Sequence, residues 1–247
     1  MALMTAPRQR ADRLLVERGL FESRAKAQAA IAAGLVTAND VAVRKASEEV
    51  PADARLNARP AHPFVSRGGV KLAAALDCFG FDPMGRVCLD VGASTGGFSH
   101  VLLERGAKRV FAVDVGREQL HASLRARPEV VVMEETDIRT LSLARFEPRP
   151  DLVAIDVSFI SLKLVLPAAL ALVQPPAQLV ALIKPQFEAG RAAVKRGIVR
   201  DVAIHADVCD AISDAVTSLG WRVVDVIPSP ITGGDGNAEF LLGAARD

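Results

Sequence analysis

The chain has 247 residues, half of them apolar and only 4% aromatic, with no tyrosine. This length fits two domains, and the apolar share allows a large core of aliphatic side chains. The three cysteines, Cys78, Cys88 and Cys209, form no CxxC pair, which argues for a reducing compartment and against a zinc site. Net charge is only +1, but residues 1–71 hold twelve Lys and Arg against seven Asp and Glu. A basic amino-terminal segment favours an anionic partner.

No segment predicts export or membrane insertion. Residues 1–13 lack the apolar stretch of a signal peptide, so we expect a cytoplasmic protein. The most apolar window, 162–183, is interrupted by Lys163 and by Pro175-Pro176, whereas a spanning helix needs about 20 mostly apolar residues. We interpret this window as helix, turn and strand, in a protein that we expect to be a monomer.

Residues 1–57 predict a small domain of two helices and a hairpin. The helices are expected over 12–18 and 24–33, the second capped by Ser23 and both closed by a glycine. Two short segments then flank Asn39-Asp40, a pair that tolerates positive φ and predicts a hairpin turn. Residues 58–64 contain two prolines and predict an extended linker.

Residues 65–247 predict a second domain in which strands alternate with helices, the pattern of a parallel sheet. The expected strands are 87–91, 109–113, 130–133, 151–156, 178–184, 222–227 and 238–243. The expected helices are 65–79, 98–105, 117–126, 162–173 and 201–219. No helix fits between the last two strands, so we expect the final strand to run antiparallel.

The first strand of this domain leads through a glycine-rich turn into a helix. The spacing Asp90-x-Gly92-x-x-x-Gly96-Gly97 differs from the dinucleotide motif Gly-x-Gly-x-x-Gly and favours a nucleoside ligand without phosphates, such as S-adenosylmethionine. Asp114 closes the next strand, where an acidic residue about 20 residues past the loop can bond ribose hydroxyls. The alternative is a plain turn of a doubly wound fold.

Charged residues follow the later strands. Asp156 and Lys184 end two parallel strands, Glu239 begins the antiparallel one, and Lys71 lies on the helix before the first strand. All four are expected at the sheet edge that carries the glycine turn. A lysine that is partly desolvated beside another lysine favours the neutral amine, which can help to deprotonate a sugar hydroxyl. The alternative is an ion-pair network that closes the sheet edge.

Residues 13–50 resemble the S4 RNA-binding domain. The resemblance rests on Arg13-Leu14-Leu15, Gly19, Ser23-Arg24, Ala27, Ile31, Gly34-x-Val36, Val43-x-Lys45-x-Ser47 and Val50. S4 hairpins often carry Asn-Gly where this chain has Asn39-Asp40, a difference that the turn tolerates. The resemblance implies RNA as the partner of the basic amino-terminal segment.

Nearly the whole chain resembles the TlyA family, and its second domain is similar to the RrmJ/FtsJ-type 2′-O-ribose RNA methyltransferases. The matching stretches are 66–72, 90–98, 156–162, 184–188 and 229–239. The resemblance implies a Rossmann-like class I methyltransferase domain, α/β with a seven-stranded, mostly parallel sheet whose last strand is antiparallel, behind a small α+β S4 domain. It also implies methylation of a cytidine 2′-hydroxyl of ribosomal RNA, with S-adenosylmethionine as donor. Because the chain stops soon after Gly243, it resembles the shorter members that act on 23S rRNA; 16S rRNA stays a second candidate.

The resemblance assigns roles to individual positions. It maps a Lys-Asp-Lys-Glu catalytic tetrad onto Lys71, Asp156, Lys184 and Glu239. The candidate cofactor residues are Asp90, Gly92, Ala93, Ser94, Thr95, Gly96, Gly97, Phe98, Asp114, Val115, Asp137 and Ile138. Among them, Asp137 could accept a hydrogen bond from the adenine amine, or it could simply cap a turn. No metal site is expected.

Basic residues at helix starts, strand ends and one loop are candidate contacts for ribosomal RNA phosphates. They are Arg10, Arg24, Lys45, Arg67, Arg139, Arg191, Lys195 and Arg196. The alternative is a solvated surface with scattered arginines.

Other functions are less compatible with the motifs. The residues after the fourth strand of the second domain, 156–159, lack the Asn/Asp-Pro-Pro-aromatic motif of amino-methylating enzymes, and no cysteine stands where cytosine-C5 enzymes need one. A non-enzymatic ribosome-binding or assembly factor predicts a decayed cofactor loop, yet the loop is complete. Some family members are labelled haemolysins, but no apolar span in this sequence supports lysis.

Overall fold

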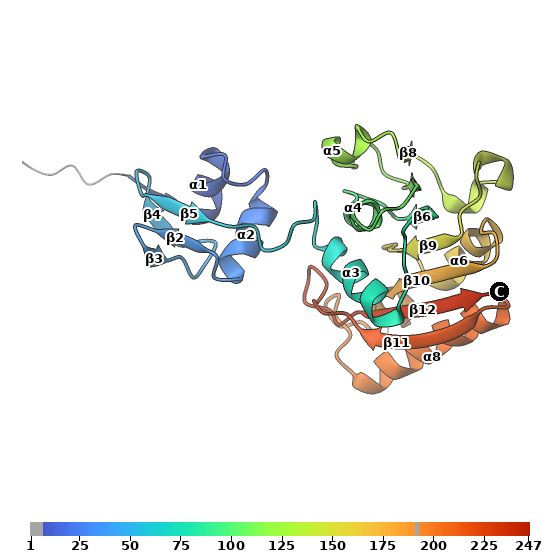
Figure 1. Ribbon diagram of the computed structural model, residues 1–247. Coiled ribbons are helices and arrows are strands. Elements are labelled where there is room, and N and C mark those ends of the chain that lie inside the picture. The colour runs from blue at the N-terminus through green and yellow to red at the C-terminus, as the bar shows by residue number, and fades with distance from the viewer. Residues whose placement is uncertain (1–6, 191–192) are drawn as a thin grey trace, which may run out of the picture. The chain divides into compact units, whose positions relative to one another are not determined.

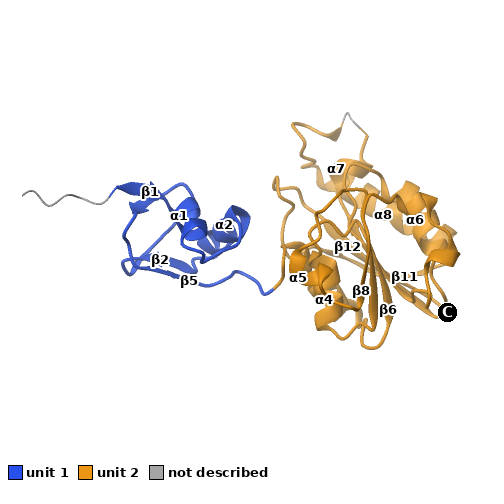
Figure 2. Cartoon of the chain, turned by 90° about the horizontal axis from the view of Figure 1, so that it is seen from above, with its two compact units in different colours: residues 1–63 blue, residues 64–247 orange. Residues whose placement is uncertain are grey.

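The computed structural model describes residues 7–190 and 193–247, and the chain forms two compact units that divide between Pro63 and Phe64 (Figure 2). Ala58, the first residue of the expected linker, is the last residue of a strand in the first unit. The connecting segment therefore starts one residue later than the sequence suggested.

From residue 7 onward, unit 1 contains two helices and five short strands. Figure 1 shows how they are arranged. They are β1 (Arg8–Arg10), α1 (Ala11–Glu17), α2 (Arg24–Ala32), β2 (Val36–Ala38), β3 (Val41–Ala42), β4 (Glu49–Pro51) and β5 (Leu56–Ala58). One sheet has the order β3-β2-β5, and β1 pairs with β4 in a second, two-stranded sheet. The strands β1, β4 and β5 were not expected, because three residues are too few to show a strand periodicity. The similarly short β2 and β3 were expected only because the turn pair Asn39-Asp40 lies between them.

Local signals explain the parts of unit 1 that the sequence did predict. The Ser23 hydroxyl accepts a hydrogen bond from the backbone N–H of Lys26 and so caps α2. Asn39 and Asp40 adopt φ angles of 51° and 65°, which is the geometry of the expected hairpin turn between β2 and β3. Leu14, Leu15 and other apolar side chains of both helices form a small core against the strands.

Unit 2 has a seven-stranded sheet with helices on both sides (Figure 1). Its strands are β6 (Val87–Val91), β7 (Arg109–Val113), β8 (Val130–Met133), β9 (Leu152–Ile155), β10 (Ala177–Ile183), β11 (Arg222–Pro228) and β12 (Phe240–Arg246). Its helices are α3 (Gly68–Phe79), α4 (Gly97–Glu104), α5 (Ala122–Arg125), α6 (Leu162–Ala171), α7 (Pro185–Glu188) and α8 (Val202–Ser218), with short 3-10 turns η1 (Ile138–Thr140) and η2 (Leu143–Arg145).

The sheet order β11-β12-β10-β9-β6-β7-β8 confirms the expected fold class. β12 is antiparallel to both β10 and β11, while the pairs among β10, β9, β6, β7 and β8 are parallel. β6 is buried at every position, as its continuous apolar run indicates. The carboxyl ends of the parallel strands therefore meet at one edge of the sheet, together with the beginning of β12.

Each face of the sheet packs against its own layer of helices. Leu72 of α3 and Leu102 of α4 pack on one face, and Leu166 of α6 and Ile212 of α8 pack on the other. This three-layer arrangement fixes the strand ends that carry the charged side chains.

The expected helix over 117–126 is wrong in its first half. Only Ala122–Arg125 is helical, and residues 115–121 form an irregular loop after β7. Glu118 in this loop has a φ of 51°, which a helix does not allow.

Candidate active site

The glycine turn after β6 lies against the end of β9. Gly92 has a φ of 83°, and a Cβ atom at this position would lie 2.3 Å from the backbone oxygen of Asp156. No other residue can occupy such a place without moving the backbone. Gly92 therefore lets the turn approach Asp156 closely.

Asp114 organises the turn from the end of β7. One carboxylate oxygen accepts a hydrogen bond from the backbone N–H of Ser94 at 2.8 Å, and the other accepts from that of Gly116 at 2.6 Å. Ser94 itself has a φ of 46°, a strained conformation for a residue with a side chain. The carboxylate thus joins the glycine turn to the loop after β7.

A cavity of about 430 Å³ opens beside Asp114, within the size range of small-molecule sites. Six of the predicted cofactor residues line it: Gly92, Ser94, Asp114, Val115, Asp137 and Ile138. Val115 is exposed at this cavity although its side chain is apolar. An apolar wall with a carboxylate at one end fits a nucleoside, whose base is flat and whose ribose carries hydroxyls.

A second cavity of about 180 Å³ adjoins the first and shares Gly92, Ser94, Asp156 and Ser158 with it. Four more predicted cofactor residues line this cavity: Ala93, Thr95, Gly97 and Phe98. Lys71 and Lys184 also line it. The two cavities are therefore neighbours, one suited to a nucleoside and the other walled by the charged residues.

Asp90 and Gly96, which were also predicted to bind the cofactor, line neither cavity. Asp90 is fully buried and accepts hydrogen bonds from the backbone N–H and the hydroxyl of Ser99 at 2.8 and 2.6 Å. Burial raises the pKa of Asp90 to about 7. A Cβ atom at Gly96 would collide with the side chains of Leu120 and Leu124. Both residues therefore have structural roles: Asp90 binds Ser99 of α4, and Gly96 lets the turn pack against two leucine side chains.

The four predicted catalytic residues come together as two ion pairs. Lys71 Nζ lies 2.5 Å from Glu239 Oε2, and Lys184 Nζ lies 2.6 Å from Asp156 Oδ1. Lys71, Lys184 and Glu239 are each at most 9% exposed. Of the four residues, Lys71 lies on α3, Asp156 and Lys184 directly follow β9 and β10, and Glu239 directly precedes β12. Buried charges of this kind are costly unless they are paired, and here each has a partner.

Two residues at this edge were missed by the sequence analysis as site residues. The Ser158 hydroxyl accepts a hydrogen bond from Lys184 Nζ at 2.8 Å, so the ammonium group has two acceptors. Phe159 lines the larger cavity, is 91% exposed and has a φ of 64°. A strained backbone and an exposed aromatic ring beside a cavity are typical of functional positions. Their place in the motif at 156–162 was the only sequence signal.

Of the two roles predicted for Asp137, an adenine contact or a turn cap, the structure shows the cap. Its carboxylate caps η1 by accepting from the backbone N–H of Arg139, and it also pairs with the Arg139 guanidinium at 2.6 Å. These hydrogen bonds lower the pKa of Asp137. Both residues nevertheless line the larger cavity. Arg139, predicted as an RNA contact, therefore stands at the cavity rather than on a separate surface.

The predicted RNA contacts of unit 1 have unequal surroundings. Arg10 and Arg24 both bind the carboxylate of Asp12, which is fully buried, while their own side chains are 39% and 49% exposed. Lys45 is exposed in the segment between β3 and β4. Two of the three cations thus have an internal partner that sequence reasoning did not foresee.

In unit 2, the guanidinium of Arg67 donates to the backbone oxygen of Thr232 at 2.6 Å. Lys195 pairs with Ile198 through backbone hydrogen bonds, and Arg196 lies between them with a φ of 53°. This tight turn presents two cations next to each other. Arg191 lies outside the described residues.

Among residues 7–190 and 193–247, no helix has both the length and the apolar character needed to cross a membrane. Over the same residues, no cluster of His, Cys, Asp and Glu side chains could hold a metal ion.

Comparisons with known proteins decide the family. Residues 64–246 match the model of the FtsJ-like methyltransferases, and residues 9–56 match the S4 domain. A protein of Mycobacterium tuberculosis named 16S/23S rRNA (cytidine-2′-O)-methyltransferase TlyA is 44% identical over 96% of this chain and 90% of its own length. The chain belongs to the TlyA family. Its second domain is an FtsJ-like methyltransferase domain.

Other members of the TlyA family carry a different label. Hemolysin A of Brachyspira hyodysenteriae is 37% identical over 94% of this chain and 98% of its own length. A solved structure from Streptococcus thermophilus, titled as a candidate hemolysin, shares 41% identity and a TM-score of 0.77, covering 97% of this chain and 89% of that one. The fold of the whole chain is thus that of the TlyA family under either label.

Proposed function

We propose that this chain methylates the 2′-hydroxyl of a cytidine in ribosomal RNA, 23S rRNA in the first place, with S-adenosylmethionine as the donor. One observation carries the proposal: the ion pairs Lys71–Glu239 and Lys184–Asp156 stand at a cavity that adjoins a nucleoside-sized one. The names of TlyA relatives that modify cytidine 2′-oxygens support the choice of substrate. The proposal places the enzyme in the cytoplasm, as a monomer that carries its own RNA-binding domain.

The residues present fit the proposed donor. The larger cavity offers the Asp114 carboxylate to ribose hydroxyls and apolar side chains, among them Val115 and Ile138, to an adenine ring. The glycine turn, where Gly92 and Gly97 lack side chains, leaves room for the methionine part between the two cavities. When bound, S-adenosylmethionine supplies a methyl group on a positively charged sulfur.

The chain's own residues then handle the hydroxyl. In the transfer, the bond from sulfur to the methyl carbon breaks and a bond from the 2′-oxygen to that carbon forms, so the hydroxyl must lose its proton. Lys184 is an ammonium paired with Asp156 in the structure, so in the proposed step it first gives its own proton to solvent. The neutral amine then accepts the proton of the hydroxyl, and Asp156 stabilises the ammonium that forms again. Ser158 fixes the direction of Nζ. Lys71, held by Glu239, also lines the small cavity and binds the ribose there.

Phe159 offers a surface for the target base. Its ring is exposed beside both the cavity and Phe187, with the two ring centroids 5.2 Å apart. Unstacked bases of RNA commonly stack on such aromatic rings. A base held there would place its ribose near Lys184.

The test uses the purified chain with separated 50S and 30S subunits and isotopically labelled S-adenosylmethionine. We expect label in 2′-O-methylcytidine from 23S rRNA, detected by nucleoside mass spectrometry. Label on a base, or none in either subunit, would contradict the proposal. Label in 30S RNA as well would widen the substrate range without changing the chemistry.

A further inference from the structure

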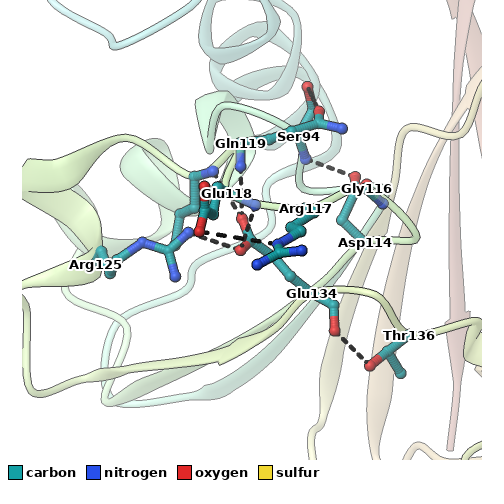
Figure 3. Close-up of polar contacts among 10 residues, drawn as sticks. Ser94, Asp114, Gly116, Arg117, Glu118, Gln119, Arg125, Glu134 and Thr136 are labelled. Carbon is teal, nitrogen blue, oxygen red and sulfur yellow. Dashed lines mark hydrogen bonds and ion pairs between the residues drawn. The ribbon is translucent and has the colours of Figure 1, made fainter.

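In the irregular loop after β7, residues 115–121, the backbone N–H groups of residues 118–120 are all bound by one carboxylate. Glu134 follows β8, and its side chain is only 12% exposed. Its two oxygens accept hydrogen bonds from the backbone N–H groups of Glu118, Gln119 and Leu120 at 2.8 to 2.9 Å (Figure 3). The guanidinium of Arg125 binds the same carboxylate at 2.7 Å. Glu134 thus replaces the helical hydrogen bonds that this segment lacks.

The loop in turn supports the glycine turn. The side-chain oxygen of Gln119 accepts a hydrogen bond from the Ser94 hydroxyl at 3.0 Å, and the backbone N–H of His121 donates to the oxygen of Thr95 at 3.2 Å. Leu120 is buried, and its side chain reaches the position that a Cβ atom of Gly96 would occupy. The loop and the turn therefore form one connected wall of the larger cavity.

Gln119 and Asp114 converge on the same point of that wall. A Cβ atom at Gly116 would lie 1.7 Å from Nε2 of Gln119 and 2.9 Å from Oδ1 of Asp114. Both side chains line the larger cavity. A carboxylate only accepts hydrogen bonds, whereas the amide nitrogen of Gln119 donates them. A ribose hydroxyl does both, so the pair matches a ribose diol better than the carboxylate does alone.

We propose that Gln119 is a second contact for the ribose hydroxyls of the cofactor, beside Asp114, and that Glu134 is the positioning residue that holds Gln119 in place. The inference rests on the proposed function, because it takes the ligand of the cavity to be S-adenosylmethionine or its product. The hydrogen bond from Arg125, with those from the loop, lowers the pKa of Glu134 to about 2. The carboxylate is therefore ionised, and able to accept all these bonds, at any pH at which the protein would be assayed.

Calorimetric titration of the full-length chain with S-adenosylhomocysteine tests the inference without relying on activity. We expect Gln119→Ala and Glu134→Gln each to weaken binding by about tenfold, the value of one hydrogen bond to a charged or polar site. The double variant should bind about as weakly as either single one, because both changes remove the same contact. Glu129→Gln is the matched control, because Glu129 also pairs with an arginine, Arg127, at 3.0 Å. This variant should bind S-adenosylhomocysteine with the affinity of the wild type.

A ligand without ribose hydroxyls sharpens the test. For 2′,3′-dideoxy S-adenosylhomocysteine, Gln119→Ala and the wild type should have the same affinity. This ligand lacks the hydroxyls that the Gln119 side chain is proposed to contact. If Gln119→Ala binds the natural product within twofold of the wild type, the inference is wrong, whatever Glu134→Gln does. Since Gln119 is exposed, this variant is expected to fold even if Glu134→Gln does not. If the wild type fails to bind S-adenosylhomocysteine at all, the proposed function fails first.

Discussion

Each unit buries charged side chains, but the two clusters are built differently. In unit 1, Asp12 Oδ2 accepts hydrogen bonds from Arg10, Arg24 and Gln28 at 2.7 to 3.2 Å, and its Oδ1 accepts one more from Arg10 at 3.1 Å. In unit 2, two carboxylates and two ammonium groups pair one to one, and Lys71, Lys184 and Asp156 line a cavity. A carboxylate surrounded by donors has no capacity left for a ligand. A pair that faces a cavity can exchange a partner for a substrate hydroxyl, which is why we place chemistry in unit 2 and architecture around Asp12.

The largest expected effect is on the rate of methyl transfer, when the charged cluster of unit 2 loses Lys184. Lys184→Ala should bind S-adenosylmethionine and RNA nearly normally and yet transfer methyl groups about 10²–10⁴-fold more slowly, because a positioned base is missing. Lys184→Arg should not restore the rate, since a guanidinium stays protonated. Single-turnover transfer to ribosomal RNA measures both, with Lys163→Ala on α6 as the control lysine. A near-wild-type rate in either Lys184 variant would reduce the cluster to an ion-pair network.

The corresponding change in unit 1, Asp12→Ala, should lower the stability of that unit and leave the methyl-transfer chemistry of unit 2 unchanged. Asp12→Ala removes a carboxylate that two arginines share, and we expect it to destabilise unit 1 by about 2 kcal/mol. This is less than for a fully buried pair, because both arginines are partly exposed. Hydrogen exchange of the α1 and α2 amides in the full-length chain would report the loss. Unchanged protection would mean that the cluster is dispensable for folding.

Asp114→Ala tests the assignment of the cofactor to the larger cavity, separately from the deprotonation of the 2′-hydroxyl in the smaller one. Removing the carboxylate takes away the acceptor for the ribose and for the Ser94 and Gly116 amides. We expect affinity for S-adenosylmethionine to fall by about 1–3 kcal/mol while RNA binding is retained. Calorimetry that finds the affinity unchanged would refute the assignment.

Asp90 is a buried carboxylate with hydroxyl and amide partners but no cation, and its pH behaviour should be opposite to that of Asp12. Its pKa is raised to about 7, whereas the arginines hold the pKa of Asp12 well below its usual range. The folded state keeps the Asp90 proton that the unfolded state loses above pH about 4. The free energy of unfolding should therefore fall from there to pH 7, by about 1.4 kcal/mol per pH unit at most. The Asp12 contribution is instead lost as pH decreases below its ordinary pKa.

Urea unfolding at pH 5 and pH 7 would separate these contributions. Asp90→Asn keeps an oxygen for Ser99 and has no charge, so the decline between the two pH values should become smaller. An equally steep decline in the variant would show that another group causes it.

The smallest expected effect concerns RNA binding by unit 1. Lys45→Ala should reduce the slope of log affinity against log salt by roughly one unit for one lost phosphate contact. Lys45 is the cleanest probe, because replacing Arg10 or Arg24 also disturbs Asp12. Filter binding of ribosomal RNA at several salt concentrations measures the slope. An unchanged slope would leave the basic face as a solvated surface.

What the sequence predicted well depended on signals within one segment. Continuous apolar runs located the strands of unit 2, and the charged residues that follow them located the edge where Lys184 and Asp156 meet. Residues whose roles depend on contacts between distant segments were missed. Residues 117–121 of the loop were expected to be helical, and nothing within them reveals that Glu134 will bind the amides of residues 118–120. In the same way, the internal partner of Arg10 and Arg24 became visible only in the fold.

The pairing of β12 with β10 makes the position of Glu239 intolerant of inserted or deleted residues. Ile183 pairs with Phe240, so Lys184 and Glu239 are the next residues along an antiparallel ladder. One residue added after Glu239 would either move the carboxylate away from Lys71 or turn every side chain of β12 to the opposite face of the sheet. The segment between β11 and β12 lies outside this ladder, and its residues Gly234 and Asp235 are exposed. Length variation among homologous sequences should therefore collect there and stop before Asn237.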